Sequence, residues 1–298
     1  MADTTLSGFA DINYNAFHSD AEEGTFGAAG ELDVAAGDDS ASVRFDLDIV
    51  DVLSTNGASG AAAQTAGVDV EQANVVLKLS DMLGLTAGIA NSPFGREGQD
   101  ATDINFAGNG LLFAQRPHNV AGALASVTLN EQISANVGYI NSLSDITGTV
   151  NAANDVVVTV AANVVDGVSL NLGYLTDSTD GMNGDMINAY VNLGLVENLD
   201  VAVEFLSGDP VNGSGNFDSG YGVVLGYNLG KASVDARYET TTAEGAGSDQ
   251  TQFSLAGNLH MSDNCVVRAD FTSHNIDTPT VLQTANEDTL TVQMVHSF

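Results

Sequence analysis

The chain is dominated by long runs in which apolar and polar residues alternate one by one. In VSLNLGYL (168–175), valine, leucine and tyrosine share one parity, while serine, asparagine and glycine share the other; LDVAVEF (199–205) and ASVDARYE (232–239) repeat the pattern. A period of two is typical of a β-strand whose two faces meet different surroundings. The runs extend over about ten residues, which suits a tilted membrane-spanning strand better than the shorter strands of soluble proteins.

The joins between these runs alternate between short turns and longer loops along the whole chain. Short turns on one rim and long loops on the other are typical of outer-membrane barrels, so the sequence predicts one all-β domain over residues 1–298. We expect a closed antiparallel transmembrane β-barrel of about sixteen strands. The expected strands cover residues 5–16, 29–37, 41–51, 69–80, 83–92, 118–129, 132–143, 154–164, 167–177, 186–196, 199–208, 220–229, 232–242, 250–260, 265–275 and 288–298.

The C-terminal segment TLTVQMVHSF is itself a half-apolar strand that ends on Phe298. An even number of strands brings the first and last strands together at the short-turn rim, where their pairing removes both sheet edges. We therefore expect this segment to pair with LSGFADINYNAF (6–17). A terminal aromatic residue after alternating apolar residues resembles the C-terminal assembly signal of bacterial outer-membrane proteins, which would place Phe298 at the periplasmic interface.

The charge balance excludes some partners and favours others. The chain carries 39 acidic residues and 7 basic ones, a formal net charge of −32. Nucleic acid is not an expected partner, because a phosphate backbone requires lysine and arginine. Residues of hydrophobic type make up 44% of the chain, yet none of its apolar stretches is long enough for a transmembrane helix. MADTTL has neither a basic segment nor an apolar core, so we interpret the sequence as the mature form without its signal peptide.

The parity of the strands predicts a polar, water-filled lumen. Seven asparagines lie on the face opposite the apolar stripe, and burying so many amides dry would be costly. Charged strand residues share that face, because a charge at mid-depth in lipid costs roughly 2–4 kcal/mol. Arg237 with Asp235, and Arg268 with Asp270, could equally be simple ion pairs of the lumen wall. The predicted inward charged residues are Glu31, Asp33, Arg44, Asp46, Asp48, Lys78, Asp235, Arg237, Arg268 and Asp270.

The longest join, Pro93 to Pro117, is too apolar to lie free in water. It follows the fifth expected strand, where the third long loop of sixteen-stranded general porins folds into the barrel and narrows the pore. By that analogy we expect its charged residues at the pore constriction, with the acids forming an acidic lip that faces Arg44 and Lys78. An external flap, or a latch onto a neighbouring subunit, is the alternative. The charged loop residues are Arg96, Glu97, Asp100, Asp103 and Arg116.

Three segments together resemble the OmpL-like β-barrel porin family. They are LSGFADINYN (6–15) in the first strand, LTAGIANSPFGREGQD (85–100) leading into the longest join, and LLFAQRPHNVAGALAS (111–126) leaving it. The general bacterial porins share the same architecture. The resemblance implies a bacterial outer-membrane barrel of the porin kind.

Other chemistry is weakly indicated. The five histidines are scattered, and no serine–histidine or cysteine–histidine motif is recognisable, so we expect neither an enzyme nor a cofactor. The segment DSTDGMNGD offers Asp177, Asp180 and Asp185 as candidate calcium ligands. It lacks the glutamate that closes a twelve-residue calcium loop, so a solvated acidic loop is the simpler interpretation.

We therefore expect a porin that passes ions and small hydrophilic solutes, with a preference for cations because acids greatly outnumber bases. Outer-membrane lipid and lipopolysaccharide would surround it. A homotrimer is expected from porin analogy and from small residues on the outward face of neighbouring strands. A receptor, an adhesin or a sheath around a partner protein is the alternative. The small outward residues are Ala87, Ala121, Ala123, Ala125 and Ala135.

Overall fold

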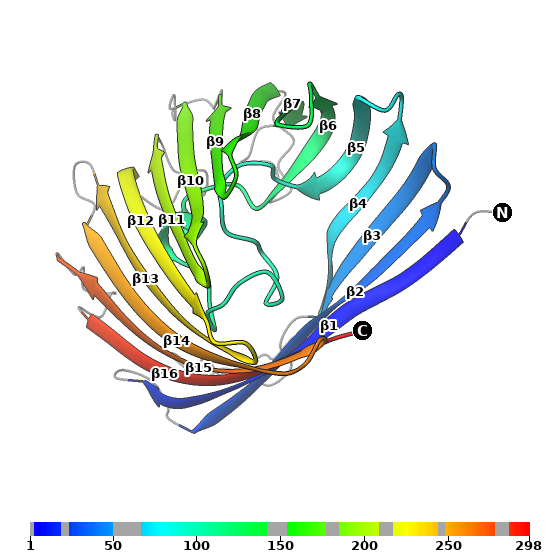
Figure 1. The fold of residues 1–298 in the computed structure, drawn as a ribbon. Helices are drawn as coiled ribbons and strands as arrows, with labels where there is room; N and C mark the ends of the chain where they lie inside the picture. Colours follow the sequence, from blue (N-terminus) through cyan, green and yellow to red (C-terminus); the bar gives the residue numbers. More distant parts are fainter. Residues whose placement is uncertain are drawn as a thin grey trace.

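The computed structural model describes residues 3–18, 24–49, 67–141, 154–176, 185–208, 217–243, 248–277 and 286–298. These segments form a closed antiparallel barrel in which each strand pairs with its neighbours in sequence and the first strand pairs with the last (Figure 1). Sixteen strands are present in this part of the chain. The predicted fold class is therefore confirmed.

Long strands make up almost all of the regular structure. The first half contains β1 (Asp3–His18), β2 (Thr25–Gly37), β3 (Ala41–Ile49), β4 (Val68–Lys78), β5 (Leu83–Asn91), the single-turn helix α1 (Leu111–Ala114), β6 (Asn119–Thr128), β7 (Ile133–Asn141) and β8 (Asn154–Val165). The second half contains β9 (Val168–Leu175), β10 (Met186–Val196), β11 (Leu199–Ser207), β12 (Phe217–Asn228), β13 (Ala232–Ala243), β14 (Gln250–Ser262), β15 (Cys265–Ile276) and β16 (Asn286–Ser297). No helix among the described residues has the length and hydropathy needed to cross a membrane.

The barrel closes where the sequence predicts, between β1 and β16. Phe9 pairs with Ser297 in the antiparallel register, and the backbone N–H of Phe298 donates to the carbonyl of Gly8 at 3.0 Å. The Ser297 N–H donates to the carbonyl of Asn264, a residue of the short β14–β15 turn. The last strand therefore ends at the short-turn rim, and its pairing leaves β1 without a free edge.

The two faces of the strands differ as the period of two requires. Large apolar residues such as Phe205, Tyr238 and Leu255 are exposed on the outer face, where lipid would cover them. Their inward neighbours include Glu204 and Arg237, which are buried inside the barrel. A contiguous outer band of this kind is far larger than the apolar patches of soluble monomers.

The connection between β5 and β6 lies inside the barrel, where it crosses the lumen as the cyan-green segment of Figure 1. It carries α1, whose Leu111, Leu112 and Phe113 are buried. The helix lies against β12, β13 and β14. Packing inside the barrel explains how so apolar a loop avoids water, and this arrangement brings the predicted charged residues together.

Candidate functional site

The lumen is shaped by the inserted loop, residues 93–117, and by the arginines that hold it. Arg237 of β13 is almost completely buried, and its guanidinium bonds to the carboxylate of Glu97 in the loop. It also donates to the carbonyl of Gly108 at 2.9 Å and lies over the ring of Phe106, 4.4 Å from the ring centroid. A side chain predicted to line the pore therefore fixes the loop to the wall.

Arg268 of β15 acts in the same way. Its guanidinium donates to the carbonyls of Phe106 and, at 3.1 Å, Ala101. The neighbouring Asp270 accepts the backbone N–H of Ala107 at 2.7 Å. An arginine and a carboxylate of one strand therefore hold adjacent backbone groups of the loop, the carbonyl of Phe106 and the N–H of Ala107.

The ion pairs within each strand, one of the two interpretations of these residues, are not formed. Arg237 bonds to Glu97 rather than to Asp235, whose carboxylate instead accepts hydrogen bonds from Asn105, Ser233 and Asn258. Residues two apart on a strand can pair, as Arg44 and Asp46 do, but here the inserted loop offers Glu97 and its backbone carbonyls as partners for the two arginines. The simple wall-pair interpretation of these arginines and aspartates is therefore wrong.

Two arginines of the loop hold its ends in place. Arg116 is buried and donates to the carbonyl oxygens of Phe94, at 2.6 Å, and of Glu97, while its guanidinium lies 4.6 Å from the centroid of the Phe113 ring. Arg96 is partly exposed, with its guanidinium 3.8 Å from the carboxylate of Glu204 on β11. Both were predicted at the constriction, and both serve at least to fold and attach the loop.

Apolar residues form a second attachment of the loop, which was not predicted from the sequence. Phe94 and Leu112 of the loop belong to a buried cluster that lies mainly against β6–β12. The wall contributes Leu124, Ile140, Val157, Leu175, Met186 and Leu206, among others. These residues lie at inward-facing positions of the strands yet are apolar. This departure from the polar inward pattern was the sequence signal for an apolar attachment of the loop.

Glycines on the inward face make room for the loop. A Cβ atom on Gly173 would lie 2.8 Å from the ring of Phe94, and one on Gly220 would lie 2.6 Å from a methyl of Leu112. A side chain at either position would therefore force Phe94 or Leu112 to shift from its present place against the wall. Isolated glycines within strands often mark such close approaches, which is a second signal that the sequence offered.

The far side of the loop meets the opposite wall at a group of carboxylates. Asp100 lies close to Glu31 of β2 and Glu71 of β4, with oxygens of all three within 4.8 Å of one another. Burial raises the pKa of Asp100 to about 6, and the negative charge of Asp103 adds to that effect. Asp103 itself donates its backbone N–H to the carbonyl of Asp100 within the loop. The loop thus brings negative charge to the part of the lumen left between itself and β2–β4.

The expected partners of these acids are elsewhere. Arg44 of β3 bonds to Asp46 at 2.7 Å and lies 3.7 Å from Asp33. Lys78 is exposed and pairs with Asp81 in the β4–β5 turn at 2.9 Å. Lys78 ends its strand at the short-turn rim, remote from where the loop leaves β5, so the loop acids do not face it. Asp100 does lie at the β2–β4 wall that carries Arg44, but within the described residues the charge of Arg44 is paired with Asp46 and Asp33 rather than with the loop acids.

The remaining wall acid of the predicted set, Asp48, lies opposite Glu31 in the β2–β3 register. It therefore adds to the inward acids of this wall.

His118, which follows the loop, has its ring stacked on Phe113 with centroids 3.9 Å apart. Burial lowers the pKa of His118, so the neutral ring is favoured there.

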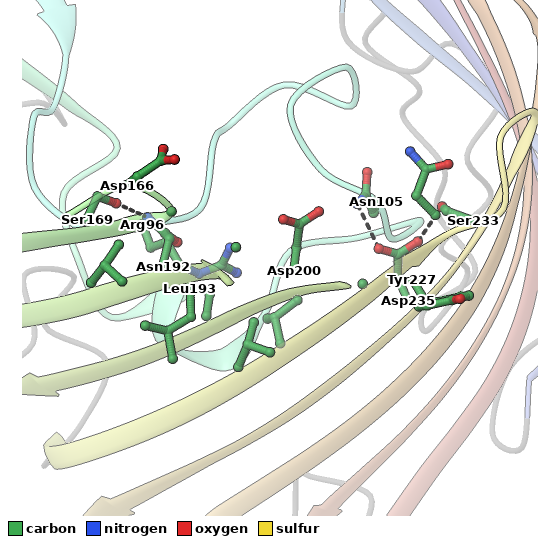
Figure 2. A pocket seen from close by; sticks show the side chains of 18 of the residues that line it. Arg96, Asn105, Asp166, Ser169, Asn192, Leu193, Asp200, Tyr227, Ser233 and Asp235 are labelled. Carbon is green, nitrogen blue, oxygen red and sulfur yellow. Dashed lines mark hydrogen bonds between the residues drawn. The ribbon is translucent and has the colours of Figure 1, made fainter. Parts of the chain in front are cut away.

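Water-accessible space remains beside the loop. A pocket of about 810 Å³ lies along the β8–β13 wall and reaches the β8–β9 turn at Asp166 (Figure 2). Its lining is largely polar and includes Arg96, Asn192, Asp200 and Asp235. Smaller pockets of about 320 and 190 Å³ adjoin the β3–β7 wall and the β14–β16 wall. The polar side chains of these surfaces offer hydrogen bonds to hydrated ions and small polar solutes.

The other two predicted sites are the C-terminal assembly signal and the candidate calcium loop. Phe298 is exposed at the end of the barrel. Asp177 and Asp180 of the calcium hypothesis lie outside the described residues, while Asp185 accepts a hydrogen bond from the hydroxyl of Tyr174. Neither the assembly signal nor calcium binding at this loop is tested by these positions.

The amino-acid sequence matches a known protein family. The family model described as "Putative beta-barrel porin-2, OmpL-like" matches residues 10–298. The chain belongs to this family. Membership places it among the porins, the channel proteins of the bacterial outer membrane. No curated protein sequence matches the chain.

Solved porin structures share the fold at low sequence identity. The anion-selective porin from Comamonas acidovorans matches with a TM-score of 0.71 at 14% identity, over 100% of both chains. OprB of Pseudomonas putida matches with a TM-score of 0.71 at 11% identity, over 100% of this chain and 94% of its own. The outer-membrane channel DcaP of Acinetobacter baumannii matches with a TM-score of 0.69 at 12% identity, over 100% of this chain and 97% of its own. At these identities the likeness concerns the fold alone.

Proposed function

We propose that the chain is a passive diffusion channel for ions and small hydrophilic solutes, and that it prefers cations. One observation carries the preference: Arg237 and Arg268 of the lumen wall are occupied by the loop, whereas three acids between the loop and the opposite wall form no ion pair in the described residues, Arg44 on that wall being paired with Asp33 and Asp46. Arg237 and Arg268 bond to loop carbonyls and Glu97, while Glu31, Glu71 and Asp100 form no ion pair within the described part of the chain.

The whole-chain charge supports the same sign. A cleft lined by one sign of charge concentrates the opposite ion, and rings of aspartate and glutamate do so in cation channels. The similar porin from Comamonas acidovorans is described as anion-selective. With 39 acids to 7 bases, the present chain has few residues that could produce that behaviour.

Reversal potentials across a KCl gradient test the preference, measured in planar bilayers with chelator present. We expect cation selectivity at low salt that weakens towards 1 M, where the screening length falls to about 3 Å. Asp100→Asn should reduce the selectivity more than Asp263→Asn, which removes the same charge from the exposed β14–β15 turn. Anion preference at low salt would refute the proposal.

The alternative of a sheath requires a lumen that can hold another chain. The inserted loop occupies that space and is attached by Arg237, Arg268 and the apolar cluster. This arrangement favours a channel over a sheath. A receptor role would instead need a saturable, high-affinity solute, which conductance block by added solutes would reveal.

We further propose a homotrimer that packs through β5–β7. Outward alanines are neighbours there, since Ala87 pairs with Ala123 across β5 and β6, and Ala135 pairs with Val127 across β6 and β7. Small residues allow barrels to approach closely in the membrane. Light scattering in mild detergent tests the state, with Ala123→Trp expected to dissociate the trimer and Leu255→Trp on the far wall to leave it intact. A monomeric wild type would refute the proposal.

A further inference from the structure

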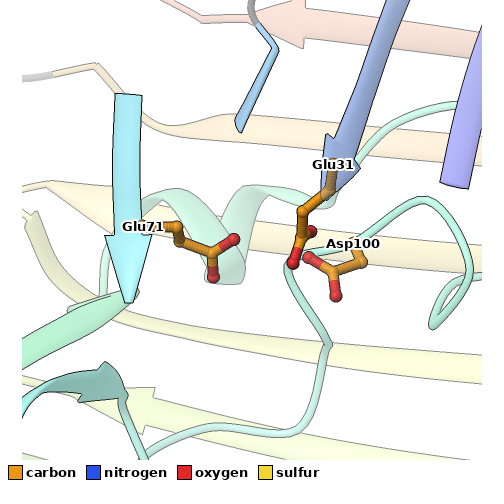
Figure 3. Close-up of side chains that lie close together, drawn as sticks. All are labelled: Glu31, Glu71 and Asp100. Atoms are coloured by element: carbon orange, nitrogen blue, oxygen red, sulfur yellow. The ribbon is translucent and has the colours of Figure 1, made fainter. Parts of the chain in front are cut away.

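Three carboxylates from separate segments converge between the inserted loop and the barrel wall. Glu31 comes from β2, Glu71 from β4 and Asp100 from the loop, and Figure 3 shows their side chains pointing towards one another. Glu71 lies at a register shift of β4, where Gln72 pairs with Asp46 but the next pair of residues is Val70 with Leu47. The bulge frees Glu71 from the strand ladder, so its side chain adds to the inward face beside Gln72.

Two of these side chains are buried without the partners that burial demands. Glu31 is 3% exposed and Glu71 is 6% exposed. The Oε2 atom of each is buried and accepts no hydrogen bond within the described part of the chain. The amide of Asn119 reaches only the other oxygen of Glu71, at 3.5 Å. Buried carboxylate oxygens normally have partners, so both atoms point to a ligand that the protein alone does not provide.

Protein bases do not supply the missing charge. Arg44, the nearest base on this wall, is bonded to Asp46 and lies near Asp33. The arginines Arg116, Arg237 and Arg268 bond to the loop, and Lys78 pairs with Asp81. The three carboxylates therefore face one another with like charge, which costs free energy unless a cation or protons offset it.

We propose that Glu31, Glu71 and Asp100 bind one divalent metal ion of the calcium class, which ties the loop to the β2–β4 wall. Calcium takes six to eight oxygen ligands at about 2.3–2.6 Å, so two ligand oxygens across the ion are up to about 5 Å apart. The three oxygens, all within 4.8 Å of one another, fit that span. Magnesium requires distances near 2.0–2.1 Å in a strict octahedron, and three carboxylates with oxygens up to 4.8 Å apart suit the longer bonds of calcium better.

The ion would complete the attachment of the loop. Arg237 and Arg268 hold one side of it, and the metal would hold Asp100 on the other side. In the adjoining group of Glu31, Asp33 and Asp46, the two aspartates already have Arg44 as a counter-charge, so the proposal concerns only the group that includes Asp100.

Calcium titration of the chelator-treated full-length barrel in detergent tests the site by calorimetry, with KCl present to screen diffuse binding. We expect one calcium ion per chain, bound more tightly than magnesium. Glu71→Gln and Asp100→Asn should each weaken binding by roughly tenfold to a hundredfold or more. Asp200→Asn, which removes one acid from the pocket on the opposite wall, should leave it unchanged. Heat-modifiable migration on gels confirms that each variant is a folded barrel.

A wild-type barrel with no saturable calcium binding would overturn the proposal, and shared protons would then account for the three carboxylates. Equal losses in Glu71→Gln and Asp200→Asn would also overturn it, because they would indicate diffuse attraction. KCl conductance measured on the same preparations separates this proposal from the channel function. A barrel that conducts but does not bind calcium would refute only the calcium site. A barrel that binds calcium but does not conduct would refute only the channel function.

Discussion

Replacing Arg237 by methionine should release the inserted loop from the β11–β15 wall. The substitution keeps an unbranched chain but removes the guanidinium, which bonds to Glu97, donates to the carbonyl of Gly108 and lies over the Phe106 ring. Glu97 would remain buried with only the backbone N–H of Gly110, at 2.7 Å, as its remaining hydrogen-bond donor. Removing one partner of a buried ion pair typically costs about 3–5 kcal/mol.

That cost falls on the docking of the loop, because the barrel strands keep their ladder without it. Since about 1.4 kcal/mol corresponds to a tenfold change in an equilibrium constant, the equilibrium constant for loop docking would fall by roughly a hundredfold to a few thousandfold. Single-channel recording should then show larger conductance steps or frequent open-channel fluctuations as the loop leaves the lumen. The double variant Arg237→Met with Glu97→Gln should recover part of the wild-type behaviour, because it leaves no buried unpaired charge.

Lys78→Met is the matched control, since it removes the same charge from an exposed side chain at the short-turn rim. It should leave conductance steps and noise unchanged. If Arg237→Met behaves like this control in conductance, noise and thermal unfolding, the arginine does not hold the loop and the reasoning fails.

Three further changes probe other parts of the molecule. Phe94→Ala should weaken loop docking by about 3–5 kcal/mol because Phe94 is completely buried. Increased current noise of the open channel would measure this weakening. Noise equal to that of Phe253→Ala, which changes an exposed phenylalanine, would contradict the prediction. Because burial lowers the pKa of His118 below about 6.5, its contribution to stability is present above that pH and is lost as pH falls through its folded pKa. The loss of thermal stability between pH 7 and 5 should therefore be smaller in His118→Phe than in wild type or His260→Phe, and equal losses would contradict this. Phe298→Ala should lower the yield of heat-modifiable barrel in outer membranes relative to Ser297→Ala, and equal yields would argue against a terminal assembly signal.

The sequence by itself determined the barrel. Each residue's face follows from its parity, and parity is a local property that water on one side and lipid on the other imposes along the whole chain. The alternating joins gave the strand order, and the half-apolar C-terminal strand gave the closure with β1. These features need no knowledge of distant contacts, which is why even the inward placement of Arg237 and Asp270 could be predicted.

Only the tertiary structure decided which lumenal groups meet. Arg237 and Glu97 are 140 residues apart in sequence, and nothing in either local pattern identifies the other. Parity states that Lys78 faces inward, but it does not give depth, and depth separates Lys78 from the loop acids. The loop conformation depends on inward glycines, buried arginines and an apolar cluster contributed by many strands at once. Closure of the barrel brings these groups together in space, and so non-local packing rather than sequence pattern determines the pore.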